Sequence, residues 1–277
     1  MFQNLTILFF KFLIKLRKSI YSQNLKDWCK KNLDDSIFII SFDFETQRDI
    51  KTIKQLTRQL NFSKIKPFYA IPGELIENNI QVLKSLSNDF TFVNHGYKVH
   101  TEYCQKEKKN YSTLLYSTLK KSDIIYDIKK AHEVIRNNFG IDCKLFRTPH
   151  FGEFCEKSDM NIVYETLRNL NYKYSFSTTP IYSLLKKPIF NEMDITEVPC
   201  NAYLDNPLQI IDSWSSKVDL SITPKIMLEG IKSYLFFMKE NKMLLNIYFD
   251  PTDIVDNKEF FNVISDFAQY QRTNIIK

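Results

Sequence analysis

Acidic and imidazole side chains follow two short apolar runs of this chain. The run over residues 36–42 is followed by Asp43 and Glu45, and a later run by His95 and His100. Carboxylates two residues apart in an extended segment point to the same side, and imidazoles with carboxylates are the usual ligands of Zn, Fe, Co or Ni. An acidic pair alone is more typical of a helix cap. With two histidines at another strand end, it indicates a metal site with a general base.

Further reactive side chains follow later apolar runs. Arg147 stands where its guanidinium could hold a carboxylate by bidentate pairing. His150 follows shortly after it, Asp212 and Trp214 share one segment, and Asp250 comes directly after the last apolar run. We therefore expect one cluster of reactive groups where the strands of the fold end.

Short apolar, β-rich runs alternate with helical patterns along most of the chain. Alternation of apolar strands with helices predicts a parallel sheet. About seven such units predict an α/β fold, a deformed parallel (β/α)7-type barrel with an N-terminal helical extension. We expect strands over 36–42, 66–71, 90–93, 144–146, 174–177, 195–199 and 243–249, and helices over 50–60, 73–86, 122–139, 159–170, 224–239 and 260–270.

The net charge of +6 is concentrated near the N-terminus. Residues 1–31 hold seven Lys or Arg and one acid, whereas residues 32–277 hold 31 basic and 31 acidic groups. The larger part therefore has no bias toward nucleic acid, and no nucleic-acid partner is expected. We expect a basic amphipathic segment over 1–31 and one barrel domain over 32–277.

The N-terminal segment is apolar as well as basic. In a helix, Lys11, Lys15 and Lys18 would form one polar stripe. Peripheral contact of residues 1–20 with an anionic membrane is one interpretation; a helix packed on the domain and a degenerate signal anchor are the others. The five cysteines form no C-x-x-C pair, which favours a reducing compartment. We expect a cytoplasmic protein, placed at the inner membrane face if the first interpretation holds.

The order of these motifs resembles that of the polysaccharide deacetylase superfamily, also called NodB-like or carbohydrate esterase family 4. That family has an acidic motif, a two-histidine motif, an R-x-P motif, an aspartate/tryptophan motif and a late strand-end motif. All five have counterparts here in the same order, across about residues 36–255. Within the superfamily, the chain looks most similar to the branch found in O-antigen and capsule gene clusters.

The resemblance implies a role for individual residues. Asp43 would be the catalytic base, oriented by Arg147. One divalent metal ion would be bound, with zinc expected first and cobalt, nickel or iron as alternatives. The expected catalytic residues are Asp43, Arg147, His150, Asp212 and Asp250, the metal ligands are Glu45, His95 and His100, and the substrate contacts are Tyr97, Pro149, Phe151 and Trp214.

The sequence departs from the family pattern at two points. The family's histidines are commonly four residues apart, whereas His95 and His100 are five apart, which is about 140° on an ideal helix. Either the loop bulges or only one of them binds metal. The late motif usually supplies a histidine that protonates the leaving group, and Asp250 stands there instead. Asp250 takes that role with a raised pKa, or activity is low, or His150 takes it, which the ordinary pKa of an imidazole favours.

The leading hypothesis is a metal-dependent hydrolase that cleaves the C–N amide bond of an N-acetylated sugar in a surface-polysaccharide precursor. Metal-activated water would attack the acetyl carbonyl. The alternative is a catalytically silent barrel that binds a glycan or a glycan-synthesis partner, which the missing late histidine favours. A glycoside hydrolase with two carboxylates is a third hypothesis, and the paired histidines disfavour it.

Overall fold

The fold is built around one curled β-sheet. The computed structural model describes residues 19–150, 152–154, 156–219 and 221–271. The strands of the sheet are β1 (Ile37–Asp43), β2 (Phe68–Ile71), β3 (Thr91–Asn94), β6 (Leu145–Phe146), β7 (Tyr174–Ser175), β8 (Phe190–Glu192), β9 (Ile195–Glu197) and β12 (Leu244–Phe249). They are ordered β12-β1-β2-β3-β6-β7-β9-β8, and all neighbours are parallel except β8 and β9.

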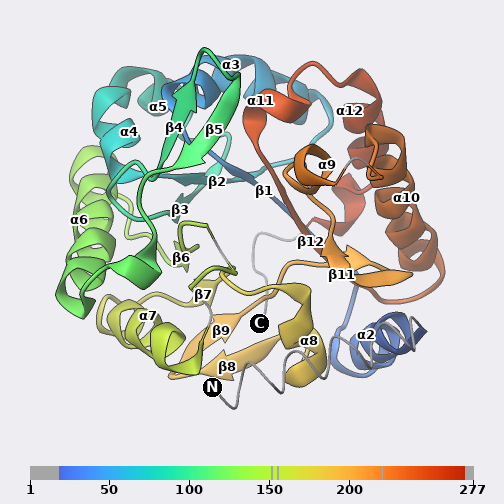
Figure 1. The fold of residues 1–277 in the computed structure, drawn as a ribbon. Helices are drawn as coiled ribbons and strands as arrows, with labels where there is room; N and C mark the ends of the chain where they lie inside the picture. Colours follow the sequence, from blue (N-terminus) through green and yellow to red (C-terminus); the bar gives the residue numbers. More distant parts are fainter. Residues whose placement is uncertain (1–18, 151, 155, 220, 272–277) are drawn as a thin grey trace.

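Most of the helices lie around the outside of the curled sheet (Figure 1). They are α2 (Ser19–Asn32), α3 (Gln47–Phe62), α4 (Gly73–Asn78), α5 (Ile80–Leu86), α6 (Lys121–Phe139), α7 (Lys157–Asn169), α8 (Pro180–Leu185), α9 (Ser215–Val218), α10 (Pro224–Glu240), α11 (Pro251–Ile254) and α12 (Lys258–Ser265). Two hairpins are separate from the sheet: β4 (Thr101–Cys104) with β5 (Lys109–Ser112), and β10 (Ala202–Tyr203) with β11 (Asn206–Ile210).

The central strands form because their sequences are continuous apolar runs. Every residue of β1 and β12 is buried, and Phe38, Ile39 and Ile40 have no exposed surface. Burial on both faces is expected of a parallel sheet covered by helices. Ile37 of β1 pairs with Leu244 of β12 in parallel register. The strands of the sheet that come first and last along the sequence, β1 and β12, are therefore neighbours, and their carboxyl ends lie side by side.

The α/β class and the mainly parallel, curled sheet are confirmed in this coarse form. A closed barrel of seven repeated strand–helix units is not confirmed. The sheet has eight strands, and its edges in the described part of the chain are β12 and β8. The difference arises around β9. There, β8 adds an antiparallel strand, and the chain then forms the β10–β11 hairpin instead of another strand of the sheet.

The helix expected over 73–86 is interrupted. α4 and α5 are separated by Asn79, whose φ of −134° lies outside the helical range. The side-chain amide of Asn79 donates a hydrogen bond to the carbonyl of Leu75 at 2.8 Å. Asparagine competes for backbone hydrogen bonds in this way, which an apolar periodicity does not reveal.

Helix α2 packs onto the rest of the fold and contributes to its core. Tyr21 and Leu25 are buried. The Tyr21 hydroxyl accepts hydrogen bonds from Nδ2 of Asn201 at 3.2 Å and from the backbone N–H of Ala202 at 3.1 Å. The last part of the expected N-terminal segment therefore contacts the barrel, and the division of the chain at residue 31 remains a prediction.

The lysine stripe of that segment, formed by Lys11, Lys15 and Lys18, lies outside the described residues. Within the described ranges, no helix has the length and apolar character needed to cross a membrane. Contact of residues 1–20 with an anionic membrane surface therefore remains a prediction from the sequence.

Candidate metal centre and its pocket

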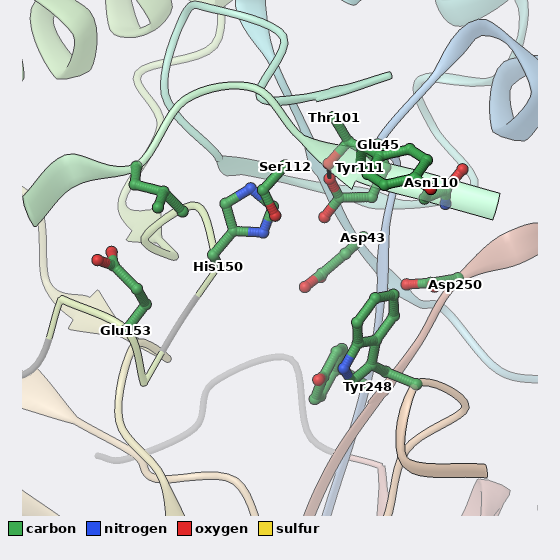
Figure 2. Close-up of a pocket in the computed structure, with 12 residues that line it drawn as sticks. Asp43, Glu45, Thr101, Asn110, Tyr111, Ser112, His150, Glu153, Tyr248 and Asp250 are labelled. Carbon is green, nitrogen blue, oxygen red and sulfur yellow. Dashed lines mark hydrogen bonds between the residues drawn. The ribbon is translucent and has the colours of Figure 1, made fainter. Parts of the chain in front are cut away.

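The carboxyl ends of four strands meet at one side of the sheet. Asp43 ends β1, His95 follows β3, Arg147 follows β6 and Asp250 follows β12. Parallel strands bring the groups at their carboxyl ends together, which is where such folds place their chemistry. A pocket of about 330 Å³ opens there (Figure 2). It is lined by Asp43, Glu45, Thr101, Asn110, Tyr111, Ser112, Leu115, His150, Glu153, Trp214, Tyr248 and Asp250.

The loop after β1 shows that Glu45 is not a helix cap. The cap of α3 is Thr46, whose side-chain oxygen accepts from the backbone N–H of Arg48. Asp49 Oδ2 in turn accepts from the N–H of Thr46 at 2.8 Å and from that of Glu45 at 3.1 Å. This capping box fixes the backbone of Glu45 and leaves its carboxylate to face the site.

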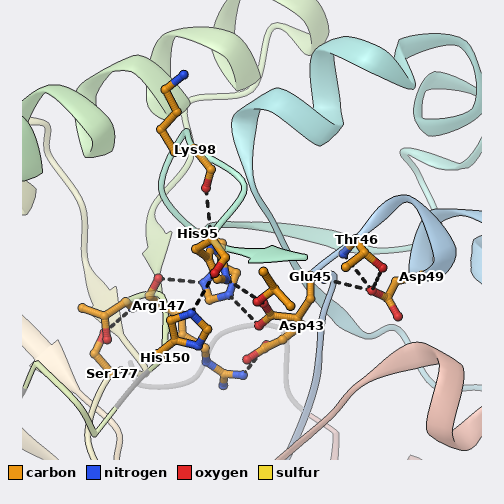
Figure 3. Close-up of polar contacts among 12 residues, drawn as sticks. Asp43, Glu45, Thr46, Asp49, His95, Lys98, Arg147, His150 and Ser177 are labelled. Carbon is orange, nitrogen blue, oxygen red and sulfur yellow. Dashed lines mark hydrogen bonds and ion pairs between the residues drawn. The ribbon is translucent and has the colours of Figure 1, made fainter. Parts of the chain in front are cut away.

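Glu45, His95 and His100 form a cluster of metal-ligand types. Their ligand atoms all lie within 4.8 Å of one another. Oε2 of Glu45 is 2.9 Å from Nε2 of His100, and Oε1 is 3.8 Å from Nε2 of His95 (Figure 3). The buried Nε2 of His95 has no hydrogen-bond partner in the described part of the chain. Two imidazoles and a carboxylate in this arrangement fit a divalent ion.

Backbone carbonyls orient both imidazoles. His95 Nδ1 donates to the carbonyl of Arg147 at 3.0 Å, and His100 Nδ1 donates to the carbonyl of Lys98 at 3.3 Å. A carbonyl only accepts, so each Nδ1 carries a proton and each Nε2 is directed toward the Glu45 carboxylate. Metal-ligating histidines are commonly oriented in this way.

The loop that carries the two histidines is not helical. Gly96 has a φ of +76°, which glycine adopts readily, and Asp127 Oδ1 accepts a hydrogen bond from the backbone N–H of Lys98 at 2.9 Å. The ring centroids of His95 and His100 consequently lie 4.7 Å apart. A bulged loop thus accommodates the five-residue spacing, and both imidazoles face the same carboxylate.

Arg147 forms a buried ion pair with Asp43 and holds its carboxylate in place. The Arg147 side chain has no exposed surface, and its Nη1 is 2.6 Å from Oδ1 of Asp43. Its Nε also donates to the carbonyl of Phe176 at 3.2 Å. A guanidinium fixed at two points keeps one orientation, so the Asp43 carboxylate has a defined position at the pocket.

Asp212 acts on the pocket through a neighbour. Its Oδ2 accepts a hydrogen bond from the hydroxyl of Tyr248 at 2.9 Å, and its Oδ1 accepts from the backbone N–H of Ser215 at 2.7 Å. Burial raises the pKa of Asp212. Tyr248 lines the pocket, but Asp212 does not. Trp214 also lines the pocket, and 42% of its surface is exposed. Asp212 therefore positions Tyr248, and Trp214 is available for contact with a ligand.

Two candidate proton donors line the pocket. Burial raises the pKa of Asp250 well above its usual range; the charge of Lys217 opposes this, but its Nζ lies closer to Oδ2 of Asp253 (2.6 Å) than to Oδ2 of Asp250 (3.2 Å). The pKa of His150 is lowered by burial and by the charge of His100. Its Nε2 also donates to the carbonyl of His100 at 3.0 Å. Asp250 is the better placed of the two to hold a transferable proton.

Two of the expected substrate contacts, Tyr97 and Pro149, do not line this pocket. The hydroxyl of Tyr97 donates to Oε2 of Glu77 at 2.9 Å, and its ring lies against Gly73, so the side chain is engaged by α4. Pro149 is buried and does not line the pocket. Phe151 lies outside the described residues.

The pocket also contains residues that the sequence did not single out. Tyr248 precedes Asp250 by two positions, and such spacing at a strand end was a usable signal, since alternate residues face the same side. The hairpin residues gave no such signal, because their segment is polar and lacks periodicity. The residues missed are Thr101, Asn110, Tyr111, Ser112, Leu115, Glu153 and Tyr248.

The sheet and its arrangement give the chain the fold of the family 4 carbohydrate esterases, the polysaccharide deacetylase class. A protein assigned as a polysaccharide deacetylase from Mycobacterium smegmatis matches with a TM-score of 0.60 and 11% identity, over 85% of this chain and 85% of that chain. The Bc1960 peptidoglycan N-acetylglucosamine deacetylase matches with a TM-score of 0.52 and 13% identity, over 86% of this chain and 85% of that chain. A family 4 carbohydrate esterase from Streptomyces lividans matches with a TM-score of 0.50 and 12% identity, over 86% of this chain and 88% of that chain.

A mutant of a family 4 pseudoenzyme with restored enzymatic activity also matches, with a TM-score of 0.51 and 12% identity, over 86% of this chain and 65% of that chain. No family model and no curated protein matches the sequence. At these identities, the likeness shows the fold alone. The expected place in the O-antigen and capsule branch remains a prediction.

Proposed function

We propose that this chain is a metal-dependent hydrolase that removes the acetyl group from an N-acetylated sugar. The observation that carries the proposal is the cluster of Glu45, His95 and His100 beside Asp43, where parallel strands end in a pocket. A fold shared with deacetylases of polysaccharides and peptidoglycan supports the same reaction class.

A divalent ion held by Glu45, His95 and His100, zinc in the first place, would acidify a water molecule and polarise the acetamide carbonyl. Asp43 accepts the proton of the attacking water as general base. Arg147 fixes the Asp43 carboxylate through the 2.6 Å contact, so the base needs no reorientation during the reaction.

The departing amine needs a proton when the C–N bond breaks. The sequence favoured His150 for this step, but its Nε2 proton is engaged by a carbonyl and its pKa is lowered by burial. Asp250 lines the pocket, and burial raises its pKa, which suits a carboxylic acid that donates near neutral pH. We therefore assign the proton transfer to Asp250, with acetate and a free amino sugar as the products.

The pocket favours a substrate without negative charge. Four of the described residues that line it are Asp or Glu, and no Lys or Arg is among the lining residues. A phosphate or diphosphate group would find no lysine or arginine in this lining to pair with, so we place the phosphate of a nucleotide- or lipid-linked precursor outside the pocket. A neutral N-acetylated sugar of a surface-polysaccharide precursor meets this requirement. Action at the cytoplasmic face of the membrane would follow from the basic residues of segment 1–20.

A silent glycan-binding barrel is the second candidate. Asp250 in place of the late histidine favours it, and a pseudoenzyme has the same fold. Such a barrel would bind a glycan in this pocket and release no acetate.

Acetate release from N-acetylated oligosaccharides separates the two candidates. The chelator-treated full chain would be reloaded with Zn, Co, Ni or Fe in turn and compared with the untreated chain. We expect activity to require one equivalent of metal, and Asp43→Asn and His95→Ala to abolish it, the latter together with metal binding. An unreloaded chain as active as the loaded one would contradict the metal-dependent reaction. Glycan binding without acetate release under every metal would favour the silent barrel.

A further inference from the structure

One face of the β4–β5 hairpin is directed at the metal centre. In this antiparallel pair, Thr101 is opposite Ser112, and Tyr103 is opposite Asn110. Opposed residues lie on the same face of an antiparallel pair, and alternate residues along a strand share a face. These four side chains therefore form one face of the hairpin, which we call the inner face.

Two contacts attach the inner face to the end of the barrel. The hydroxyl of Thr101 donates a hydrogen bond to Oε2 of Glu45, a residue of the candidate metal centre. The guanidinium carbon of Arg48, in the first turn of α3, lies 3.6 Å from the ring centroid of Tyr103. A cation over an aromatic face is an attractive contact, so the hairpin has a defined position relative to Glu45.

The remaining members of the inner face, Asn110 and Ser112, line the pocket (Figure 2). The Asn110 amide oxygen is buried, yet it has no hydrogen-bond partner in the part of the chain that the structure describes. Buried polar atoms are nearly always paired. Asn110 is half-buried and lines the pocket, and the terminal torsion of an amide side chain is soft, so a turn of the amide presents this unpaired acceptor to a bound ligand.

We propose that Asn110 is a substrate-recognition residue, and that the inner face of the β4–β5 hairpin forms one wall of the sugar-binding site. The Asn110 amide oxygen accepts a hydrogen bond from a hydroxyl or amide N–H of the glycan. The nature of this ligand rests on the proposed function, whereas the unpaired acceptor does not. Asn110 takes no part in proton transfer, so it contributes to binding of substrate and transition state alike.

The test uses the zinc-loaded full chain with fully N-acetylated chitotetraose as the probe. Asn110→Ala removes the acceptor, so we expect KM to rise about tenfold, the usual effect of one lost hydrogen bond, with kcat nearly unchanged. Asn110→Asp keeps an acceptor oxygen and should restore most of the affinity. Glu102 is an exposed residue of the same hairpin that does not line the pocket, so Glu102→Gln is the matched control and should resemble wild type.

Binding is measured in parallel by calorimetry in an Asp43→Asn background, which keeps the probe intact. If the wild type releases acetate and Asn110→Ala changes neither KM nor the Kd, the inference is wrong and the proposed function stands. If no acetate is released but Asn110→Ala weakens binding of the probe, the inference stands and the proposed function fails. If the wild type neither hydrolyses nor binds the probe, both are overturned. Equal losses in Asn110→Ala and Asn110→Asp, with lowered Tm in both, would show a structural role and also overturn the inference.

Discussion

At the scale of single residues, Glu45 is held as an anion against its burial. Burial opposes the charge of this carboxylate, but the nearby imidazoles of His100 and His95 outweigh it and hold the pKa of Glu45 well below the usual range. Thr101 donates to Oε2, the oxygen that also faces His100. A carboxylate that is ionised and fixed by an outer hydrogen bond is preorganised to bind a cation.

Replacing Thr101 by valine should weaken metal binding without removing a ligand. Loss of an outer partner typically lowers metal affinity about 10–100-fold, and we expect zinc affinity to fall within that range. Thr101→Ser keeps the hydroxyl and should bind zinc like the wild type. Competition with a chromogenic chelator measures both variants. Equal affinities of the valine variant and the wild type would show that the hydroxyl does not orient Glu45.

The assignment of the general acid is tested by a pair of variants. Asp250→Asn removes a proton donor from the pocket, and loss of a general acid should lower kcat about 10²–10⁴-fold. His150→Ala should have a smaller effect on kcat, because that imidazole already donates to the carbonyl of His100. Both are measured as acetate release at saturating substrate. The reverse order of the two losses would return the role to His150, as the sequence suggested.

At the scale of elements, the strands could be predicted from the sequence and the hairpin could not. β1 and β12 lie within one residue of the apolar runs expected, because burial on both faces leaves a continuous apolar pattern. Groups that directly follow such strands, such as Asp43 and His95, could therefore be identified. Asn110 could not, since its place depends on the register of a polar hairpin; Tyr248 was missed although its spacing from Asp250 at a strand end was a usable signal.

The loop between β3 and β4 is fixed by acids from two helices. Oε2 of Glu74, in α4, accepts a hydrogen bond from the backbone N–H of Val99 at 2.7 Å. Asp127, in α6, accepts from the backbone N–H of Lys98 at 2.9 Å and from the hydroxyl of Tyr116 at 2.7 Å. Helices on the outside of the sheet thereby hold the backbone that presents both histidines.

Asp127→Ala should weaken metal binding from a distance. The change leaves the backbone N–H of Lys98 and the hydroxyl of Tyr116 without their acceptor, at a cost of about 1–3 kcal/mol each in the free energy of unfolding. We expect zinc affinity to fall about tenfold as the loop loosens. Tyr116→Phe keeps the Lys98 contact, so it should lower stability while zinc affinity stays near wild type. Chelator competition and urea unfolding separate these effects, and equal zinc affinities of all three proteins would contradict a positioning role.

At the scale of the whole molecule, the site depends on both ends of the described chain. Asp43 from the first strand and Asp250 from the last line one pocket, because β1 and β12 pair along their length. Helix α2 also packs on this fold, where Tyr21 accepts hydrogen bonds from Asn201 and Ala202. Residues 19–32 thus belong to the folded unit, and a functional N-terminal segment is to be sought before them.

Deleting residues 2–18 should remove a membrane contact and leave the folded unit intact. This segment carries four basic residues and no acid, and each basic group near an anionic surface contributes about 1 kcal/mol to binding. Vesicle sedimentation with anionic and neutral lipids measures the effect. We expect the full chain to bind anionic vesicles, the deletion to bind them much less, and the difference to shrink at high salt, because exposed charges are screened.

Tyr21→Phe in the full chain is the control, because it should lower stability and leave vesicle binding unchanged. It removes the hydroxyl that accepts from Nδ2 of Asn201 and from the N–H of Ala202. Because the N–H of Ala202 is left unpaired inside the fold, whereas Asn201 keeps its contact with the hydroxyl of Tyr234, the free energy of unfolding should fall by about 1–3 kcal/mol, while vesicle binding is kept. The deletion should show unchanged unfolding and zinc affinity, since it leaves Glu45, His95 and His100 in place. If the deletion lowers stability as Tyr21→Phe does, and vesicle binding is unaltered, the segment serves the fold and the membrane contact is wrong.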